Sequence, residues 1–159
     1  MFRSGIGYDA HRFGEGRKLV LGGVEIAHPR GLEGHSDADV LSHAIADALL
    51  GAIGERDIGH HFPNTDESIR GISSLEILRR VGEILAAQKY RVANIDATLI
   101  AEAPKIGPHL EAMRTRIGEA LALEIGQVGL KATTNEGMGA VGREEGMCAM
   151  AVASVEKLG

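Results

Sequence analysis

Hydrophobic residues recur along the chain with two periods, which predict where its helices and strands lie. A stripe at every third or fourth position predicts a helix capped by Ser36 or Asp37, with apolar members Val40, Leu41, Ala44, Ile45, Ala48, Leu49, Ala52 and Ile53. Ser73 and Glu76 form a capping-box pattern ahead of a second helix that extends to about Gln88. Pro108 fits the first turn of a third helix.

Shorter apolar runs predict strands at 2–9, 18–21, 24–26, 92–100, 128–134 and 146–155. Gly22 and Gly23 separate the second run from the third, which is the signal of a two-residue hairpin. The last run is almost wholly apolar, as in a strand buried on both faces. Residues 54–71 show weak periodicity and many turn residues, which predicts a structureless functional loop.

The order of these elements predicts the fold class. We expect one α+β domain over residues 1–159, with a mixed β-sheet of about four main strands and helices packed on one face.

Composition and charge argue against several classes of protein. The formal net charge of −5 argues against a nucleic-acid-binding surface, which needs clustered Lys and Arg. Cys148 is the single cysteine, so no internal disulfide forms, and its apolar surroundings predict an inert buried thiol. No apolar run approaches the roughly 18 residues of a membrane span. We therefore expect a cytoplasmic protein.

Asp9 and His11 form the first candidate site. Residues two apart in an extended chain point to the same side, so a carboxylate and an imidazole face one spot. Such ligands suit Zn²⁺, and His43 on the first helix is the best third ligand. Asp39 and Asp47 lie four residues from His43 on one helix face, where either could bind its other ring nitrogen. Asp-x-His by itself is a weak signal.

Polar clusters at three other places predict a phosphate site. Lys131–Gly137 brings two hydroxyls, a carboxylate and flexible backbone to a strand end, where Glu136 could hold Mg²⁺; a plain β-turn is the alternative. Ala101–Gly107 is a second strand-end loop whose backbone could read a base edge, and Lys105 could meet a phosphate or remain an ordinary surface lysine. His35 precedes a helix N-terminus and is placed to orient an anion.

Seven motifs occur in order along the whole chain: GYDAHRF, GGVEI, HSDADVLSHAIADALLGA, DIGxxFPNTD, AEAPKIxPH, KATTNEGMG and GREEG. In these motifs the chain resembles the 2-C-methyl-D-erythritol 2,4-cyclodiphosphate synthase family of the non-mevalonate isoprenoid pathway. The resemblance implies conversion of 4-diphosphocytidyl-2-C-methyl-D-erythritol 2-phosphate to the cyclic diphosphate and CMP. In that reaction the substrate's own 2-phosphate attacks its β-phosphorus, a phosphorus–oxygen lyase step.

The resemblance also implies roles for individual residues. Asp9, His11 and His43 match zinc ligands, and Glu136 matches the ligand of a Mg²⁺ or Mn²⁺ that bridges the diphosphate. His35 and Thr134 match the groups that orient phosphates and stabilise the transition state. The residues that match substrate contacts are Asp9, His11, His35, Ser36, Asp57, Ile58, Gly59, Phe62, Pro63, Asn64, Thr65, Asp66, Ala101, Glu102, Ala103, Pro104, Lys105, Ile106, Gly107, Thr133, Thr134, Asn135, Glu136, Ala140 and Arg143.

Family members form homotrimers, with each site between two subunits. Arg143 matches a residue near the three-fold axis, where an apolar channel can hold an isoprenoid diphosphate. Ala140 departs from the larger apolar or aromatic side chain common in relatives, which puts any channel ligand in doubt. Ile106 and Gly107 also vary from common forms.

Two other readings of the residues remain open. A mononuclear zinc hydrolase would use the same Asp/His/His site with a general base beside the open position. A non-catalytic trimeric binder of nucleotides or isoprenoid diphosphates would keep ligand binding after Asp9→Ala. The hydrolase leaves the polar loops that contain AEAPK and KATTNE unexplained.

Overall fold

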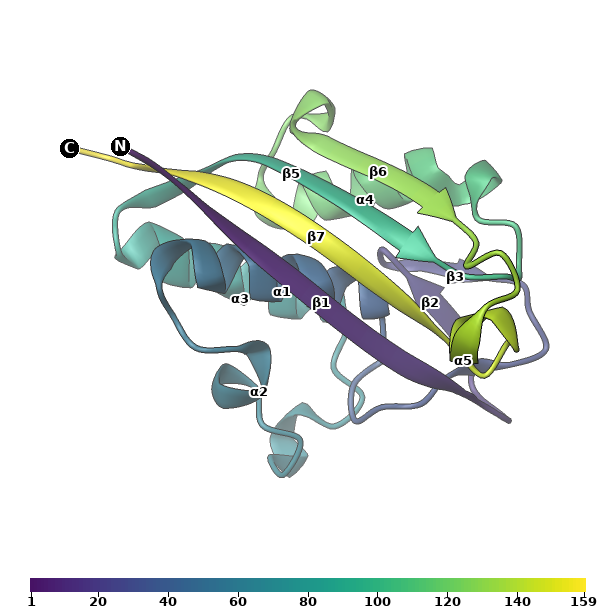
Figure 1. Ribbon diagram of the computed structural model, residues 1–159. Helices are drawn as coiled ribbons and strands as arrows, with labels where there is room; N and C mark the ends of the chain where they lie inside the picture. Colours follow the sequence, from purple (N-terminus) through teal and green to yellow (C-terminus); the bar gives the residue numbers. More distant parts are fainter.

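Three helices cover one face of a mixed five-stranded sheet in the computed structural model, which describes residues 1–159 (Figure 1). The strands lie in the order β4 (Gly31–Leu32), β1 (Phe2–Gly14), β7 (Gly146–Lys157), β5 (Tyr90–Ile100) and β6 (Val128–Thr133). Only β5 and β6 are parallel. The main helices are α1 (Val40–Ile53), α3 (Ser74–Ala87) and α4 (Leu110–Leu121). The predicted α+β class with helices on one face is confirmed.

Smaller elements connect this framework. A separate two-stranded sheet pairs β2 (Leu19–Leu21) with β3 (Val24–Ile26) across the predicted Gly-Gly turn, in which both glycines have positive φ. Short helical segments are α2 (Ile58–His61), α5 (Gly139–Gly142), η1 (Glu67–Ile69), η2 (Gly107–His109) and η3 (Ile125–Gln127). None of the helices is both long and apolar enough to cross a bilayer.

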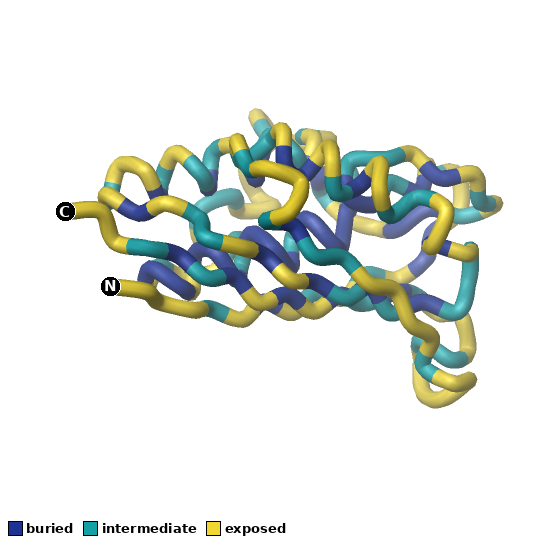
Figure 2. The backbone as a smooth tube through the Cα atoms, turned by 90° about the horizontal axis from the view of Figure 1, so that it is seen from above, coloured by how far each residue is buried: buried dark blue, intermediate teal, exposed yellow.

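The core lies between the helices and the sheet, where Figure 2 shows most of the buried backbone. Alternation along the strands produces it: Ile95, Ala97 and Leu99 of β5 face the helices and are buried. Helix α1 is buried on nearly all sides because it packs against β1, β7 and α3 at once.

Glycines on β1 let α1 approach the sheet closely. A Cβ at Gly7 would lie 1.9 Å from the carbonyl oxygen of Ala44, and one at Gly5 would lie 2.2 Å from that of Ala48. Small residues on both elements therefore bring the helix backbone against the strand. This approach places His43 of α1 opposite the side chains of β1.

Several sequence predictions need correction at element ends. Strand β1 was predicted to end at Asp9 but continues to Gly14, so Asp9 and His11 both lie within it, and β4 was missed. The loop predicted over 54–71 contains α2 and η1. Helix α1 is capped by Asp39, because 36–39 forms a turn with Ala38 at φ 58°.

Two further corrections concern burial and capping. Ser73 caps α3 through the amide of Leu75, but the Glu76 side chain bonds Arg79 and Arg80 instead of completing a capping box. Strand β7 is buried on its helix-facing side alone, since Met150 and Val152 are about half exposed on the other side. Cys148 shares this outer face and is only half-buried, and burial raises the pKa of its thiol.

Candidate metal centre and phosphate-binding pockets

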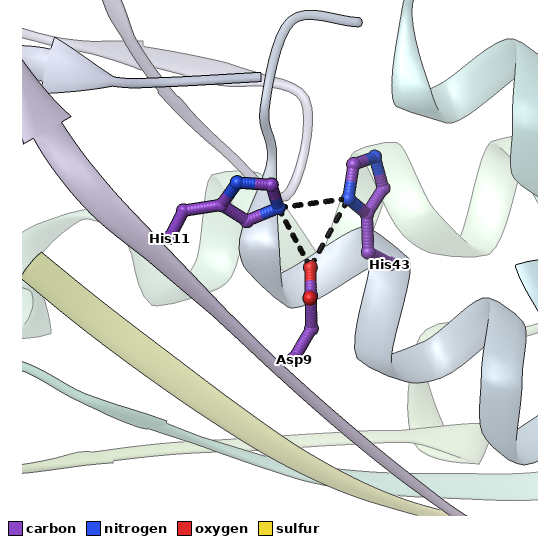
Figure 3. A group of neighbouring side chains, drawn as sticks. All are labelled: Asp9, His11 and His43. Carbon is purple, nitrogen blue, oxygen red and sulfur yellow. Dashed lines mark hydrogen bonds and ion pairs between the residues drawn. The ribbon is translucent and has the colours of Figure 1, made fainter. Parts of the chain in front are cut away.

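Asp9, His11 and His43 converge although 32 residues separate the two histidines. Alternation along β1 turns Asp9 and His11 toward the helices, and the first turn of α1 presents His43 to them (Figure 3). Asp9 Oδ2 lies 2.8 Å from His11 Nε2 and 3.1 Å from His43 Nδ1. The two ring nitrogens lie 3.2 Å apart.

This triangle fits one face of a metal coordination tetrahedron. Ligand atoms about 2.0–2.1 Å from a zinc ion are about 3.3 Å from one another, close to the three separations observed. One carboxylate oxygen and two imidazole nitrogens form a donor set that Zn²⁺ accepts, and three protein ligands leave a fourth position open. The residues therefore fit a catalytic-type metal site.

A hydrogen bond on the far side of the His11 ring fixes the tautomer that can bind a metal. Its Nδ1 lies 2.6 Å from the backbone carbonyl oxygen of Glu33, which can only accept a hydrogen bond. Nδ1 therefore carries a proton, which leaves Nε2 to bind a metal or, without one, to take a second proton and donate it to Asp9.

The prediction that Asp39 or Asp47 binds the second ring nitrogen of His43 is wrong. Asp39 is fully buried and accepts hydrogen bonds from the amides of Gly22, Gly23 and Ser42. Asp47 accepts from the amide of Ile58 at 2.7 Å. Both carboxylates accept hydrogen bonds from backbone amides, and neither is hydrogen-bonded to His43. Its Nε2 lies instead 2.8 Å from Ser74 Oγ and 3.2 Å from Ser36 Oγ.

Opposite shifts of pKa follow from the close approach of Asp9 and His11. Burial alone would raise the pKa of Asp9, but hydrogen bonds from His11 and His43 outweigh it and lower this pKa from 3.8 to about 2. Burial would lower the pKa of His11, but its hydrogen bond and ionic attraction to Asp9 raise it overall. The carboxylate is therefore ionised at neutral pH, as a metal ligand must be.

A pocket of about 270 Å³ opens beside this triangle. Predicted site residues that line it are His11, His35, Ser36, His43, Ile58, Gly59, Phe62 and Asn64. His35 is tied to the loop across the pocket, because its Nε2 lies 2.9 Å from the carbonyl oxygen of Asp66. Asp57, Pro63, Thr65 and Asp66 belong to the same loop without lining the pocket; Asp57 and Asp66 cap α2 and η1.

A second pocket, of about 300 Å³, lies where β5 and β6 end side by side. Its predicted members are Ala101, Glu102, Pro104, Lys105, Ile106, Gly107, Thr133 and Thr134. Ala103, Asn135 and Glu136 are adjacent in sequence but do not line it. This pocket shares no lining residue with the pocket beside Asp9.

The loop that carries Glu136 is organised by another glutamate. Glu102 Oε1 accepts hydrogen bonds from the amides of Asn135 at 3.0 Å and Gly137 at 3.1 Å. The Glu136 amide donates to Thr134 Oγ1 at 3.2 Å, and Glu136 itself has a left-handed φ of 53°. The Glu136 carboxylate is therefore exposed on a loop whose backbone is fixed by hydrogen bonds to Glu102.

Ala140 and Arg143 lie at a third place. Ala140 lines a pocket of about 320 Å³ on the outer sheet face with Tyr8 and Cys148. Arg143 is exposed and pairs with Glu145.

Sequence reasoning missed Ser74, Asp37 and Glu102 as supports of the site. Ser73-Ser74 at a helix start offered a hint, because one hydroxyl suffices for the cap and the other needs a different partner. Nothing local indicates that this partner is a histidine 31 residues away.

Comparison with known proteins agrees with this geometry. A family model described as the YgbB family matches residues 2–156. The 2-C-methyl-D-erythritol 2,4-cyclodiphosphate synthase of Alkaliphilus metalliredigens is 60% identical over 153 residues, which is 96% of each chain. The enzyme of the same name from Symbiobacterium thermophilum is 61% identical over 151 residues, covering 95% of this chain and 96% of the relative.

Solved structures share the fold. A Plasmodium falciparum structure described as IspF in complex with CDP has a TM-score of 0.86 and 30% identity, covering 99% of this chain and 97% of that one. The bifunctional IspDF of Campylobacter jejuni has a TM-score of 0.95 and 37% identity, covering 99% of this chain but 43% of that larger one. The chain therefore belongs to the YgbB family, together with the 2-C-methyl-D-erythritol 2,4-cyclodiphosphate synthases.

Proposed function

We propose that this protein converts 4-diphosphocytidyl-2-C-methyl-D-erythritol 2-phosphate to 2-C-methyl-D-erythritol 2,4-cyclodiphosphate and CMP. The observation that carries the proposal is the convergence of Asp9, His11 and His43 in a chain 60% identical to a synthase of that name. The reaction is a cyclising phosphorus–oxygen lyase step, in which a P–O bond to the substrate's 2-phosphate forms as the bond to CMP breaks.

Asp9, His11 and His43 would hold Zn²⁺, and the exposed Glu136 would hold Mg²⁺ or Mn²⁺ against the diphosphate. When bound, such cations supply Lewis-acid polarisation of the phosphorus and neutralise developing charge. The attacking 2-phosphate is already anionic, so the chain needs no strong general base. Alignment and charge stabilisation supply the catalysis.

The chain's own groups orient the substrate in this scheme. His35 faces the pocket beside Asp9 and is fixed by Asp66, so it is suited to orient a phosphate there. The 57–66 loop would hold the erythritol part. Ala101–Gly107 and Thr133 would hold the cytidine diphosphate, with Thr134 beside the phosphates; solved relatives described as CDP-bound support a cytidine nucleotide as ligand.

The active unit in this proposal is a homotrimer with each site between subunits. The two pockets lie at opposite sides of the sheet order, because β7 and β5 separate β1 from β6. The outer sheet face exposes Ile6, Tyr8, Met150 and Val152, an apolar set that packing against further copies would bury. A neighbouring subunit would then bring its strand-end pocket to the Asp9 pocket.

An isoprenoid diphosphate is the proposed ligand of the three-fold axis. The Ala140 pocket would receive the apolar chain and Arg143 the diphosphate. Small Ala140 leaves this pocket wide, so the fit to a chain is looser than with an aromatic side chain at that position.

Turnover tests the proposal directly. Purified protein with substrate, Zn²⁺ and Mg²⁺ should release CMP and the cyclic diphosphate in equal amounts, and Asp9→Ala should release neither while remaining folded. Metal-loaded trimer that yields no CMP would reject the proposal. Hydrolysis of generic phosphate esters without cyclisation would favour a zinc hydrolase instead.

A further inference from the structure

Behind His43, on the side away from Asp9, lies a pair of polar side chains, the buried Ser74 and the half-buried Asp37. Ser74 begins α3 and is fully buried, and its Oγ lies 2.8 Å from His43 Nε2. The same hydroxyl donates to Asp37 Oδ1, while the Ser74 amide donates to Asp37 Oδ2 at 2.9 Å. Asp37 thus accepts hydrogen bonds from both the hydroxyl and the amide of Ser74.

The direction of these hydrogen bonds follows from counting protons. A serine hydroxyl has one proton, and an ionised carboxylate can only accept. Once Ser74 donates to Asp37, its oxygen can only accept from His43, so Nε2 must carry the ring proton. His43 Nδ1 is then free of its proton, so that a metal can replace the hydrogen bond that this nitrogen otherwise makes to Asp9.

The other tautomer leaves a conflict. If Nδ1 carried the proton, the bare Nε2 and Asp37 Oδ1 would compete for the single proton of Ser74. Ser36 relieves this conflict only in part: its hydroxyl can donate to the bare Nε2 from 3.2 Å, but the Ser74 oxygen would still face the same lone pair at 2.8 Å.

We infer that Ser74 and Asp37 are positioning residues that select the metal-binding tautomer and ring orientation of His43. The inference rests on the proposed metal site and deepens it. Asp37 and Ser74 touch neither metal nor substrate; they act through the ring of His43. His11 reaches the same state through a backbone carbonyl, whereas His43 depends on two side chains that mutation can remove.

Nitrogen NMR of metal-free protein with ¹⁵N-labelled histidine reads the tautomer without any turnover. Because Asp9 also attracts a proton to Nδ1, the readout is the share of the Nε2–H form, which should be larger in wild type than in Ser74→Ala. Asp37→Asn should raise the share of the Nδ1–H form. With its amide oxygen on the Ser74 N–H, its NH₂ faces Oγ and the Asp39 amide, so the Ser74 hydroxyl is free to donate to His43.

Zn²⁺ titration against a chelating dye gives the second readout. Ser74→Ala should raise the dissociation constant about 10- to 100-fold, the usual range for loss of a partner behind a metal-bound histidine. Ser74→Thr keeps the hydroxyl and should restore most of the affinity. The matched control is Ser73→Ala, which removes the neighbouring hydroxyl and the α3 cap but leaves His43 untouched.

The outcomes separate this inference from the proposed function. Wild type that binds Zn²⁺ and turns over, while Ser74→Ala and Asp37→Asn keep wild-type tautomer and affinity, would overturn the inference alone. Equal weakening by Ser73→Ala would also overturn it, because the effect would then come from α3 stability. Wild type that fails to bind Zn²⁺ through Asp9 would reject the proposed metal site, whatever the tautomer of His43.

Discussion

The pocket beside Asp9 and the pocket at the ends of β5 and β6 are built in different ways. Asp9, His11 and His43 project from a long central strand and a buried helix, so packing of the core sets their separations. Thr134 and Glu136 lie on an exposed loop that two hydrogen bonds to Glu102 hold in place. The first region is preorganised by packing of the core, whereas the second depends on hydrogen bonds at the surface.

Removing a ligand from the preorganised pocket should have the largest effect. Asp9→Ala should lower kcat/KM about a thousand-fold or more, because a metal centre supplies several kcal/mol of charge stabilisation. Steady-state CMP release and Zn²⁺ titration measure the loss. Circular dichroism should show an unchanged fold; an active Asp9→Ala enzyme would contradict the metal role.

Changing Glu136, the proposed cation ligand of the strand-end loop, should have a smaller effect on activity. Glu136→Gln should reduce kcat about a hundred-fold, since one charge-stabilising contact is lost while alignment persists. Zn²⁺ affinity should stay at the wild-type value, because Glu136 is not part of the Asp9 cluster. A parallel drop in Zn²⁺ affinity would show that the two regions are not separate.

Pushing α1 from the sheet should disturb the first region through packing alone. A methyl group at Gly7 would collide with the backbone oxygen of Ala44, so Gly7→Ala should destabilise the fold by about 1–3 kcal/mol and weaken Zn²⁺ binding. Gly126→Ala is the control, because a Cβ there meets nothing within 4 Å. Urea unfolding measures both, and wild-type stability of Gly7→Ala would contradict the close approach.

Acid should destabilise the metal-free protein through Asp9. Its folded pKa lies below its unfolded one, so this contribution is present above about pH 4 and is lost as pH falls toward 2. The raised pKa of His11 has the opposite sign: its contribution is present below the ordinary histidine value and lost as pH rises through the folded pKa. We expect about 1–2 kcal/mol from Asp9, allowing for its partial exposure.

Urea unfolding of chelator-treated protein at several pH values tests this. In Asp9→Asn the acid-dependent loss between about pH 4 and 2 should shrink by that amount. An unchanged pH profile would show that Asp9 is not held by the two histidines.

Loosening the strand-end loop should give the smallest effect. Glu102→Ala removes the acceptor of two backbone amides, so it should cost about 1 kcal/mol of stability and raise KM a few-fold. Glu102→Gln keeps an acceptor oxygen and should lie nearer wild type. Isothermal titration with CDP and steady-state kinetics compare the variants. Equal KM values for wild type, Glu102→Ala and Glu102→Gln would show that Glu102 does not support this pocket.

Local patterns predicted the helices, the hairpin and the identity of the three converging ligands. Alternation along β1 sufficed to place Asp9 and His11 on one side, because a strand turns every second side chain to the same face. The 3.6-residue period likewise placed Ala44 and Ala48 on a buried face. His43 on the first predicted helix was the best candidate for the third ligand, and the motif resemblance supported it.

Only the tertiary structure decided which groups hydrogen-bond to the far side of those ligands. Asp39 has an ordinary helix-face spacing from His43, yet it caps α1 and binds the Gly22–Gly23 turn, while Ser74 from another helix reaches the ring. The division of the candidate site into two separate pockets is likewise a consequence of strand order. The physical reason is that a hydrogen bond needs its partner within about 3 Å, and which distant segments come that close depends on how whole elements pack.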